Sequence, residues 1–264
     1  MRSGLIGAIG SRLAHPVHRF EERLLPLRPF ERLQLPSPPS LTVICDDGAV
    51  NDTDIVEVLD GLGVKGVFAI SPALVGRTGF LGFDQIRAMH LAGHEIAFHG
   101  TTNDGFTAFA DASALETSMR RGLAQMKDEG LSVPRTLVYP YGLNNRWVRA
   151  AVSTHFDCAF TTWHGLNDGV TNRFAIRRVA FGAYSGKLPA TEEWYRQIID
   201  EAVRGSCWPA LMLHPGAEGH TRAHTGLLQR LLNSALERGL AIHTAAAHLG
   251  ASGQGQSAPS AAYG

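Results

Sequence analysis

The chain has 264 residues, of which 44% are hydrophobic, and it carries 24 basic and 24 acidic side chains. A chain of this length and apolar content buries a large core, as one barrel-sized domain or two smaller ones do. The lack of net charge argues against nucleic acid or an anionic membrane as a partner, because both require a concentrated basic face. Three scattered cysteines are too few for a disulfide framework, which favours buried thiols in a reducing compartment.

The first forty residues contain no segment that predicts a membrane span or a secretion signal. The apolar run at 4–10 is too short and too rich in glycine for either. Residues 15–35 are rich in Arg, Glu, Leu and Pro, which indicates an ordered extension around the domain or a mobile arm. We therefore predict a cytoplasmic protein with an N-terminal extension at 1–39, a main domain at 40–249 and a disordered tail at 250–264.

Strands and helices are predicted to alternate from residue 41 onward. Buried apolar runs predict strands at 41–45, 64–70, 94–99, 136–140, 157–161, 174–181, 210–214 and 240–244. Helical spacing of apolar residues predicts helices at 51–62, 83–92, 112–129, 145–154, 191–204 and 225–238. This alternation is typical of a parallel α/β architecture, and seven or eight repeats of the unit favour a barrel over an open sheet.

The first predicted strand runs directly into two carboxylates, Asp46 and Asp47, and then into Gly48. Carboxylates at the end of a strand buried on both faces are costly unless something pairs with them. A divalent metal, or a reaction that needs a base, would explain the arrangement. The alternative is a plain turn at Gly48, in which one of the carboxylates caps the following helix.

Polar side chains also end other predicted strands. His99 ends the third strand, Tyr141 follows the fourth, and His214 ends a late one. The carboxyl ends of the strands meet on one face of a parallel barrel, so these residues are expected to converge. Asp47 and His99 offer the oxygen and nitrogen that a divalent cation binds, and Asn103 could add a carbonyl oxygen.

This set of residues predicts metal-assisted hydrolysis of an amide or ester. The cation would lower the pKa of a bound water toward ~7 and polarise a substrate carbonyl. Asp46 could then act as general base and His214 as general acid. The backbone N–H near Tyr141 could hold the developing oxyanion.

Four blocks of the sequence together resemble the polysaccharide deacetylases, carbohydrate esterase family four, over about residues 40–249. The blocks are Cys45-Asp46-Asp47-Gly48, Gly93-His94-Glu95-Ile96-Ala97-Phe98-His99, Tyr139-Pro140-Tyr141-Gly142 and Leu211-Met212-Leu213-His214. The resemblance implies a distorted barrel of about seven parallel strands and one divalent cation, with zinc favoured over cobalt, manganese or nickel. It also implies removal of an acetyl group from an N-acetylated amino sugar. On this basis Asp46 is the base, Asp47 and His99 are metal ligands, and His214 is the acid.

Two departures from the family pattern bear on the site. Asn103 stands where the family has a second metal-binding histidine, so the metal shell is completed by this weaker ligand or by the neighbouring Asp104. Val138 stands where many members carry an arginine that orients the base. Arg177 or Arg178, on a later predicted strand, could provide that charge.

The substrate itself is less well defined by the sequence. Trp163 and Trp208 could form an apolar wall for the acetyl methyl group or the sugar ring. An intracellular, lipid-linked or metabolite-borne sugar is favoured over cell-wall polymer because no secretion signal is predicted. Two alternatives remain open, namely hydrolysis of a cyclic amide or ureide on the same fold and sugar binding without catalysis. The sequence does not predict the oligomeric state.

Overall fold

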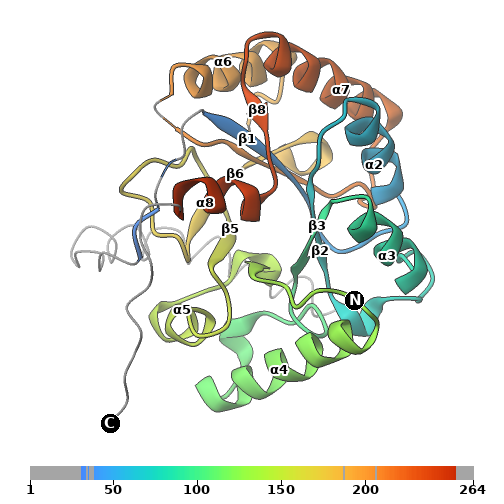
Figure 1. The fold of residues 1–264 in the computed structure, drawn as a ribbon, viewed down its shortest axis with the longest axis vertical. Helices are drawn as coiled ribbons and strands as arrows, with labels where there is room; N and C mark the ends of the chain where they lie inside the picture. The colour runs from blue at the N-terminus through green and yellow to red at the C-terminus, as the bar shows by residue number, and fades with distance from the viewer. Residues whose placement is uncertain (1–30, 34, 36–38, 187, 206, 254–264) are drawn as a thin grey trace.

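Parallel strands form a ring that is surrounded by helices (Figure 1). This computed structural model describes residues 31–33, 35, 39–186, 188–205 and 207–253. The strands are β1 (Ser40–Cys45), β2 (Val67–Ile70), β3 (Glu95–Phe98), β4 (Thr136–Val138), β5 (Cys158–His164), β6 (Ile176–Ala180), β7 (Ala210–Leu213) and β8 (Ala241–Ile242). The α-helices are α2 (Asp52–Gly61), α3 (Phe83–Leu91), α4 (Ala112–Asp128), α5 (Arg146–Val152), α6 (Glu192–Val203), α7 (Arg222–Glu237) and α8 (Ala245–Gly253). Short 3₁₀ turns are η2 (Pro72–Leu74), η3 (Phe106–Ala108), η4 (Pro140–Gly142) and η5 (Gly182–Ser185).

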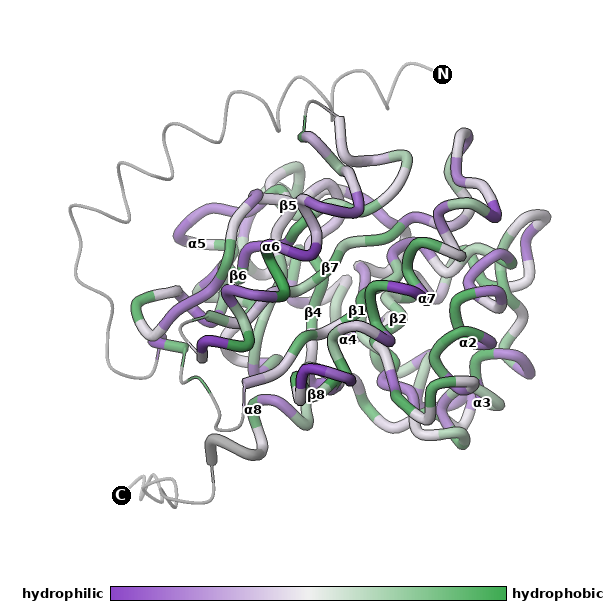
Figure 2. Tube along the Cα trace, turned by 90° about the horizontal axis from the view of Figure 1, so that it is seen from above, coloured by the Kyte–Doolittle hydropathy of each residue, from purple (hydrophilic) through white to green (hydrophobic). Residues whose placement is uncertain are grey.

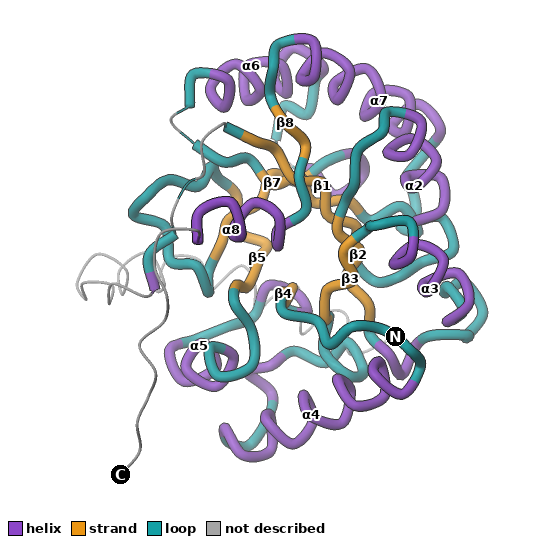
Figure 3. The backbone as a smooth tube through the Cα atoms, in the orientation of Figure 1, coloured by secondary structure: helices purple, strands orange, loops and turns teal. Residues whose placement is uncertain are grey.

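The ring closes because β1 pairs with both β2 and β7. Strands β2 to β7 follow one another in chain order, and each pairing is parallel. The short strand β8 pairs with the first residues of β1, while β2 pairs with its last residues, so β8 lies outside the ring of seven. The predicted barrel of about seven parallel strands is confirmed, and Figure 3 shows the strands enclosing its axis.

Alternate residues of each strand face opposite sides of the sheet. They therefore pack into two separate buried clusters, one on each side. Leu41, Val43 and Cys45 pack in the cluster between the strands and the helices. Ile44 belongs to the cluster inside the ring, together with Val138 and other residues of the strands. The helices present one apolar side to the ring, and Figure 2 shows hydrophobic and hydrophilic residues alternating along α2 and α7. Both faces of the strands are therefore buried, as their sequence predicted.

The amino-terminal end of the barrel is closed by residues from both ends of the described chain. Leu33 is 2% exposed and packs in the inner cluster, and its N–H donates to the carbonyl of Thr171 at 2.8 Å. Trp208 stacks on His248 of α8, with ring centroids 3.6 Å apart. The prediction that Trp208 lines the substrate pocket is therefore wrong, because Trp208 precedes β7 and lies at the opposite end of that strand from His214.

The described part of the N-terminal extension is ordered against the barrel, since the Arg173 N–H also donates to the carbonyl of Glu31. The rest of the extension lies outside the described residues. Helix α8 runs to Gly253 and includes the first residues of the predicted tail, whose remainder at 254–264 is also not described. None of the described helices is long and apolar enough to cross a membrane.

Candidate active site at the carboxyl ends of the strands

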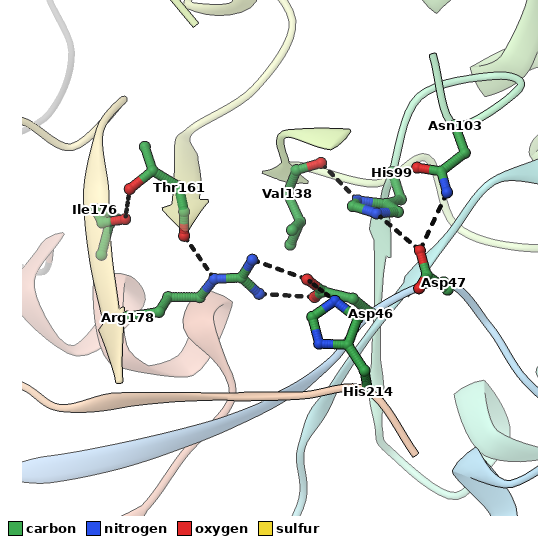
Figure 4. A network of polar contacts seen from close by, with 9 residues as sticks. All are labelled: Asp46, Asp47, His99, Asn103, Val138, Thr161, Ile176, Arg178 and His214. Carbon is green, nitrogen blue, oxygen red and sulfur yellow. Dashed lines mark hydrogen bonds and ion pairs between the residues drawn. The ribbon is translucent and has the colours of Figure 1, made fainter. Parts of the chain in front are cut away.

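The site residues face the inside of the barrel because they continue the inward-facing register of their strands. Asp46 follows inward-facing Ile44 by two positions, and His99 follows inward-facing Ala97 in the same way. Arg178 likewise follows Ile176. Side chains that come from β1, β3 and β6 therefore converge at one end of the lumen (Figure 4).

Asp46 and Arg178 form a buried, bidentate ion pair. The Nη1 and Nη2 groups of Arg178 donate to the two carboxylate oxygens of Asp46 at 2.7 and 2.8 Å. Arg178 is 1% exposed and Asp46 is 2% exposed. Burial alone would raise the pKa of Asp46, but the positive charges of Arg178 and His214 and the hydrogen bond from Arg178 outweigh it and lower the pKa. Asp46 is therefore held as a carboxylate in the lumen.

An irregularity between β5 and β6 brings a backbone carbonyl of β5 to Arg178, where it is the third hydrogen-bond acceptor beside the two oxygens of Asp46. Phe160 pairs with Ile176 and His164 with Arg178, so four residues of β5 span the length of two residues of β6. The carbonyl of Thr161 accepts a hydrogen bond from Arg178 Nε at 2.7 Å. Of the two predicted candidates, Arg178 thus contacts Asp46, whereas the side chain of Arg177 lies beside Gly165.

His214 completes this half of the site. Its Nε2 lies 3.5 Å from Asp46 Oδ2, and its side chain is 13% exposed. Burial lowers the pKa of His214, the charges of Asp46 and Asp47 oppose that effect, and the neighbouring Arg178 and His99 add to it. His214 therefore sits at the edge of the lumen, between the buried carboxylate and the opening.

Asp47 and His99 form the other half of the site. The Nδ1 atom of His99 lies 2.8 Å from the carbonyl of Val138, which can only accept, so Nδ1 carries a proton. Nε2 is thereby aimed at Asp47 Oδ1, at 3.4 Å. Burial alone would raise the pKa of Asp47, but the hydrogen bond and charge of His99 and a hydrogen bond from Asn103 lower it to about 2.

Asn103 also reaches this centre. Its Nδ2 donates to Asp47 Oδ1 at 3.1 Å, while its Oδ1 is buried without a hydrogen-bond partner in the described part of the chain. A half-turn of the amide would exchange the two atoms. Asp104, the other residue considered for this place, is exposed and accepts a hydrogen bond from Thr102.

These residues fit a divalent cation. Two ligands about 2.0–2.1 Å from one zinc ion, at a tetrahedral angle, lie roughly 3.3–3.4 Å apart, and the Asp47 and His99 ligand atoms are separated by 3.4 Å. A neutral imidazole nitrogen and a carboxylate oxygen are both acceptors, so a cation or a proton must lie between them. Among the described residues, no three His, Cys, Asp or Glu side chains form a metal-binding group. A third protein ligand would therefore have to come from Asn103 Oδ1.

Tyr141 lies at the opening of the site, 44% exposed. Its backbone is left-handed, with φ 57°, and Gly142 follows with φ 68°. A Cβ atom on Gly142 would lie 2.6 Å from the Thr162 backbone nitrogen, so only glycine fits here. Burial and the charges of Asp47 and Asp104 raise the pKa of Tyr141. Trp163, which the sequence suggested as a wall of the substrate pocket, lies on β5 and is largely buried, with an exposure of 7%.

Asp52 is a buried carboxyl group near the site that the sequence analysis did not single out. In the structure Asn51 is the N-cap and Asp52 is the first residue of α2, fully buried. Neither carboxylate oxygen has a hydrogen-bond partner among the described residues. Burial raises the pKa of Asp52 well above its ordinary range, and the charges of Asp47 and Asp46 raise it further. Asp52 is therefore a buried carboxyl group whose ionisation is disfavoured by burial and by the two neighbouring carboxylates.

Comparison with known proteins agrees with this geometry. Residues 35–156 match the family model for polysaccharide deacetylase. This segment of the chain is therefore similar to the polysaccharide deacetylases. The family block around Asp46 and Asp47 and the block that ends at His99 both fall within the match. No curated protein matches the chain in sequence.

Solved structures of carbohydrate esterase family four share the fold. The Xyl-CE4 domain of a multidomain xylanase, from the hindgut metagenome of Trinervitermes trinervoides, is 15% identical with a TM-score of 0.57, over 81% of this chain and 91% of that one. A family 4 acetyl xylan esterase from Clostridium thermocellum, solved with a cobalt ion, is 17% identical with a TM-score of 0.53, over 77% and 87%. A family pseudoenzyme from Bacillus anthracis is 14% identical with a TM-score of 0.55, over 81% and 66%. The resemblance that the four sequence blocks indicated is confirmed at the level of family and fold.

Proposed function

We propose that this protein is a metal-dependent hydrolase that removes the N-acetyl group from an acetamido sugar. The observation that carries the proposal is the separation of the adjacent carboxylates into two environments. Asp46 is paired with Arg178 and lies beside His214, while Asp47 faces Nε2 of His99. One carboxylate is thus available for proton transfer and the other for a cation.

The roles follow from these contacts. Asp47 Oδ1, His99 Nε2 and Asn103 Oδ1 would hold the cation, which supplies an acidified water and polarises the acetyl carbonyl. Asp46 receives a proton from the attacking water through a lone pair that Arg178 leaves unused, since a carboxylate has about four acceptor sites. Because Arg178 lowers the basicity of Asp46, this transfer requires an acidified water. His214 Nε2 then delivers a proton to the leaving amine nitrogen.

Tyr141 and its neighbours would receive the acyl group. The left-handed backbone at Tyr141 and Gly142 turns the chain sharply at the opening of the site. We assign the backbone N–H of Tyr141 as the donor to the oxyanion that develops as water attacks. The cytoplasmic location, and an intracellular sugar intermediate as substrate, remain part of the proposal, and cell fractionation would test the location.

The direct test is acetate release from N-acetylglucosamine oligosaccharides, lipid-linked sugars and glycosylated metabolites, with Zn²⁺, Co²⁺ or Mn²⁺ supplied. We expect release by the wild-type protein and loss of release in Asp46→Asn. Elemental analysis is the second arm. Asp47→Ala should lose the metal and Asp104→Ala, the matched control, should retain it. Metal-loaded wild-type protein that releases no acetate from any of these compounds would overturn the proposal.

One observation favours a second candidate, a sugar-binding domain without catalysis. Asn103 replaces a charged or imidazole ligand, and its amide nitrogen faces Asp47 in the structure. If the cation is lost, purified protein will hold less than about a tenth of an equivalent of metal and will still bind sugar. Release of ring-opened product from hydantoin-like or imide-like compounds, without acetate release, would instead assign the chain to cyclic amide hydrolysis.

A further inference from the structure

An exposed tyrosine covers one face of the His214 ring. Tyr184 belongs to η5, the short turn after β6, and its ring stacks on the His214 imidazole with centroids 4.1 Å apart and planes 16° apart. Tyr184 is 55% exposed, so it is not part of the core. An exposed aromatic ring gains little by burial, and its position over a candidate catalytic histidine calls for a different explanation.

His214 lacks the contact that usually orients a catalytic histidine. Its Nδ1 is buried without a hydrogen-bond partner in the described part of the chain. Its Nε2 lies 3.5 Å from Asp46 Oδ2, at the outer limit of a hydrogen bond. A histidine normally receives its orientation from a hydrogen bond at the second ring nitrogen. The charged groups around it, Asp46, Asp47, Arg178 and His99, attract or repel the ring but do not bind Nδ1.

The turn that carries Tyr184 is itself held against the loop that follows His214. Gly182 has φ 72°, and a Cβ atom there would lie 3.5 Å from the rings of His220 and His224. A Cβ on Gly219 would likewise lie 3.6 Å from Ala183. These segments therefore pack against each other beside the stacked rings of Tyr184 and His214.

We propose that Tyr184 is a positioning residue for His214, and that its stacked ring replaces the missing hydrogen bond at Nδ1. The stack restricts rotation of the imidazole and keeps Nε2 directed at Asp46 and the reacting group. Aromatic stacking of this kind favours one orientation of the ring beyond the effect of burial. The inference rests on the proposed function for its catalytic consequence and on geometry for the positioning itself.

The catalytic consequence depends on the leaving group. When the tetrahedral adduct collapses, the C–N bond breaks, its electron pair goes to nitrogen, and that nitrogen takes the proton from His214 Nε2. The products are acetate and a neutral amine. An amine leaves poorly without this proton, whereas 4-nitrophenolate leaves from 4-nitrophenyl acetate without protonation. A defect in positioning the acid must therefore slow amide hydrolysis far more than hydrolysis of the activated ester.

The experiment compares Tyr184→Leu, Tyr184→Phe and the wild-type enzyme on an acetamido sugar and on 4-nitrophenyl acetate. General acid catalysis is worth about 10²–10⁴-fold, and an aromatic stack accounts for roughly a 2- to 12-fold preference, so we expect kcat of Tyr184→Leu on the sugar to fall roughly 4- to 12-fold. KM and the rate on the ester should change less than about 3-fold, and Tyr184→Phe should restore the sugar rate because it keeps the ring. Adding Tyr184→Leu to His214→Ala should cause no further loss.

Equal losses on the two substrates, or no rescue by phenylalanine, would overturn the inference. If the wild-type enzyme releases no acetate, the proposed function fails, and a crystal structure of Tyr184→Leu then decides the positioning on its own. We expect His214 Nε2 to move away from Asp46 Oδ2 in that structure. An unchanged 3.5 Å separation would refute the role of Tyr184. Thermal unfolding serves as the control for folding, since an exposed side chain should alter Tm little.

Discussion

Arg178 stabilises the fold as well as the candidate base, so its removal has a large and specific effect. Its guanidinium makes three charge-assisted hydrogen bonds, two to Asp46 and one to the Thr161 carbonyl, all between 2.7 and 2.8 Å. Arg178→Met keeps much of the volume and leaves the carboxylate of Asp46 buried without a partner. Breaking a buried pair in this way costs about 3–5 kcal/mol. At about 2–4 °C per kcal/mol for a domain of this size, Tm should fall by roughly 6–20 °C.

Urea unfolding at neutral pH measures this cost, and a double-mutant cycle identifies its source. The double variant Asp46→Asn/Arg178→Met removes the unpaired charge and should recover a large part of the loss. The matched control is Arg177→Met, one position along the same strand, where the side chain faces away from the lumen and the cost should stay below about 1 kcal/mol. The reasoning is wrong if Arg178→Met costs as little as Arg177→Met, or if the cycle shows no coupling between Asp46 and Arg178.

Three further outcomes are expected. Because the folded pKa of Asp46 is lowered, the Asp46–Arg178 pair stabilises the protein above the unfolded aspartate pKa of about 3.9. That stability is lost as pH falls through the folded pKa, so urea midpoints of the wild type and of Asp46→Asn/Arg178→Met should converge in acid; a constant difference would contradict this. Leu33→Ala should cost about 2–5 kcal/mol by leaving a cavity at the closed end of the barrel, whereas Leu91→Ala, at a residue 86% exposed, should cost almost nothing. Asn103→His should raise metal content if residue 103 is in the shell, and unchanged content would remove it from the ligand set.

The order of strands and helices could be read from the sequence because it depends on local patterns. Apolar runs predicted each strand of the ring, and α2 ends at Gly61, close to the predicted end at residue 62. The two carboxylates of the first strand were predicted to be either a turn that caps the next helix or half of a site. The turn is present, since Asp47 has φ 78°, but neither carboxylate caps α2, whose N-cap is Asn51. Asp47 also faces His99, as the second prediction requires.

The choice between Arg177 and Arg178 could not be made from the sequence. Strand β6 is largely buried on both faces, so its hydrophobic pattern does not show which side faces the lumen. The partner of Asp46 lies 132 residues away in the chain, and it reaches Asp46 only because the ring closes between β1 and β7. The position of Trp208 was also predicted wrongly. The sequence next to a strand does not show at which end of the barrel a tryptophan side chain lies.

The sequence by itself predicted the alternating architecture, the resemblance to the polysaccharide deacetylases and the candidate residues Asp46, Asp47, His99 and His214, because each is a property of short segments. Only the tertiary structure decided the contacts of those residues. It paired Asp46 with Arg178, turned the amide of Asn103 toward Asp47 and brought Tyr184 onto His214. These contacts depend on strand register, ring closure and loop packing, which are set by interactions between segments far apart in the chain.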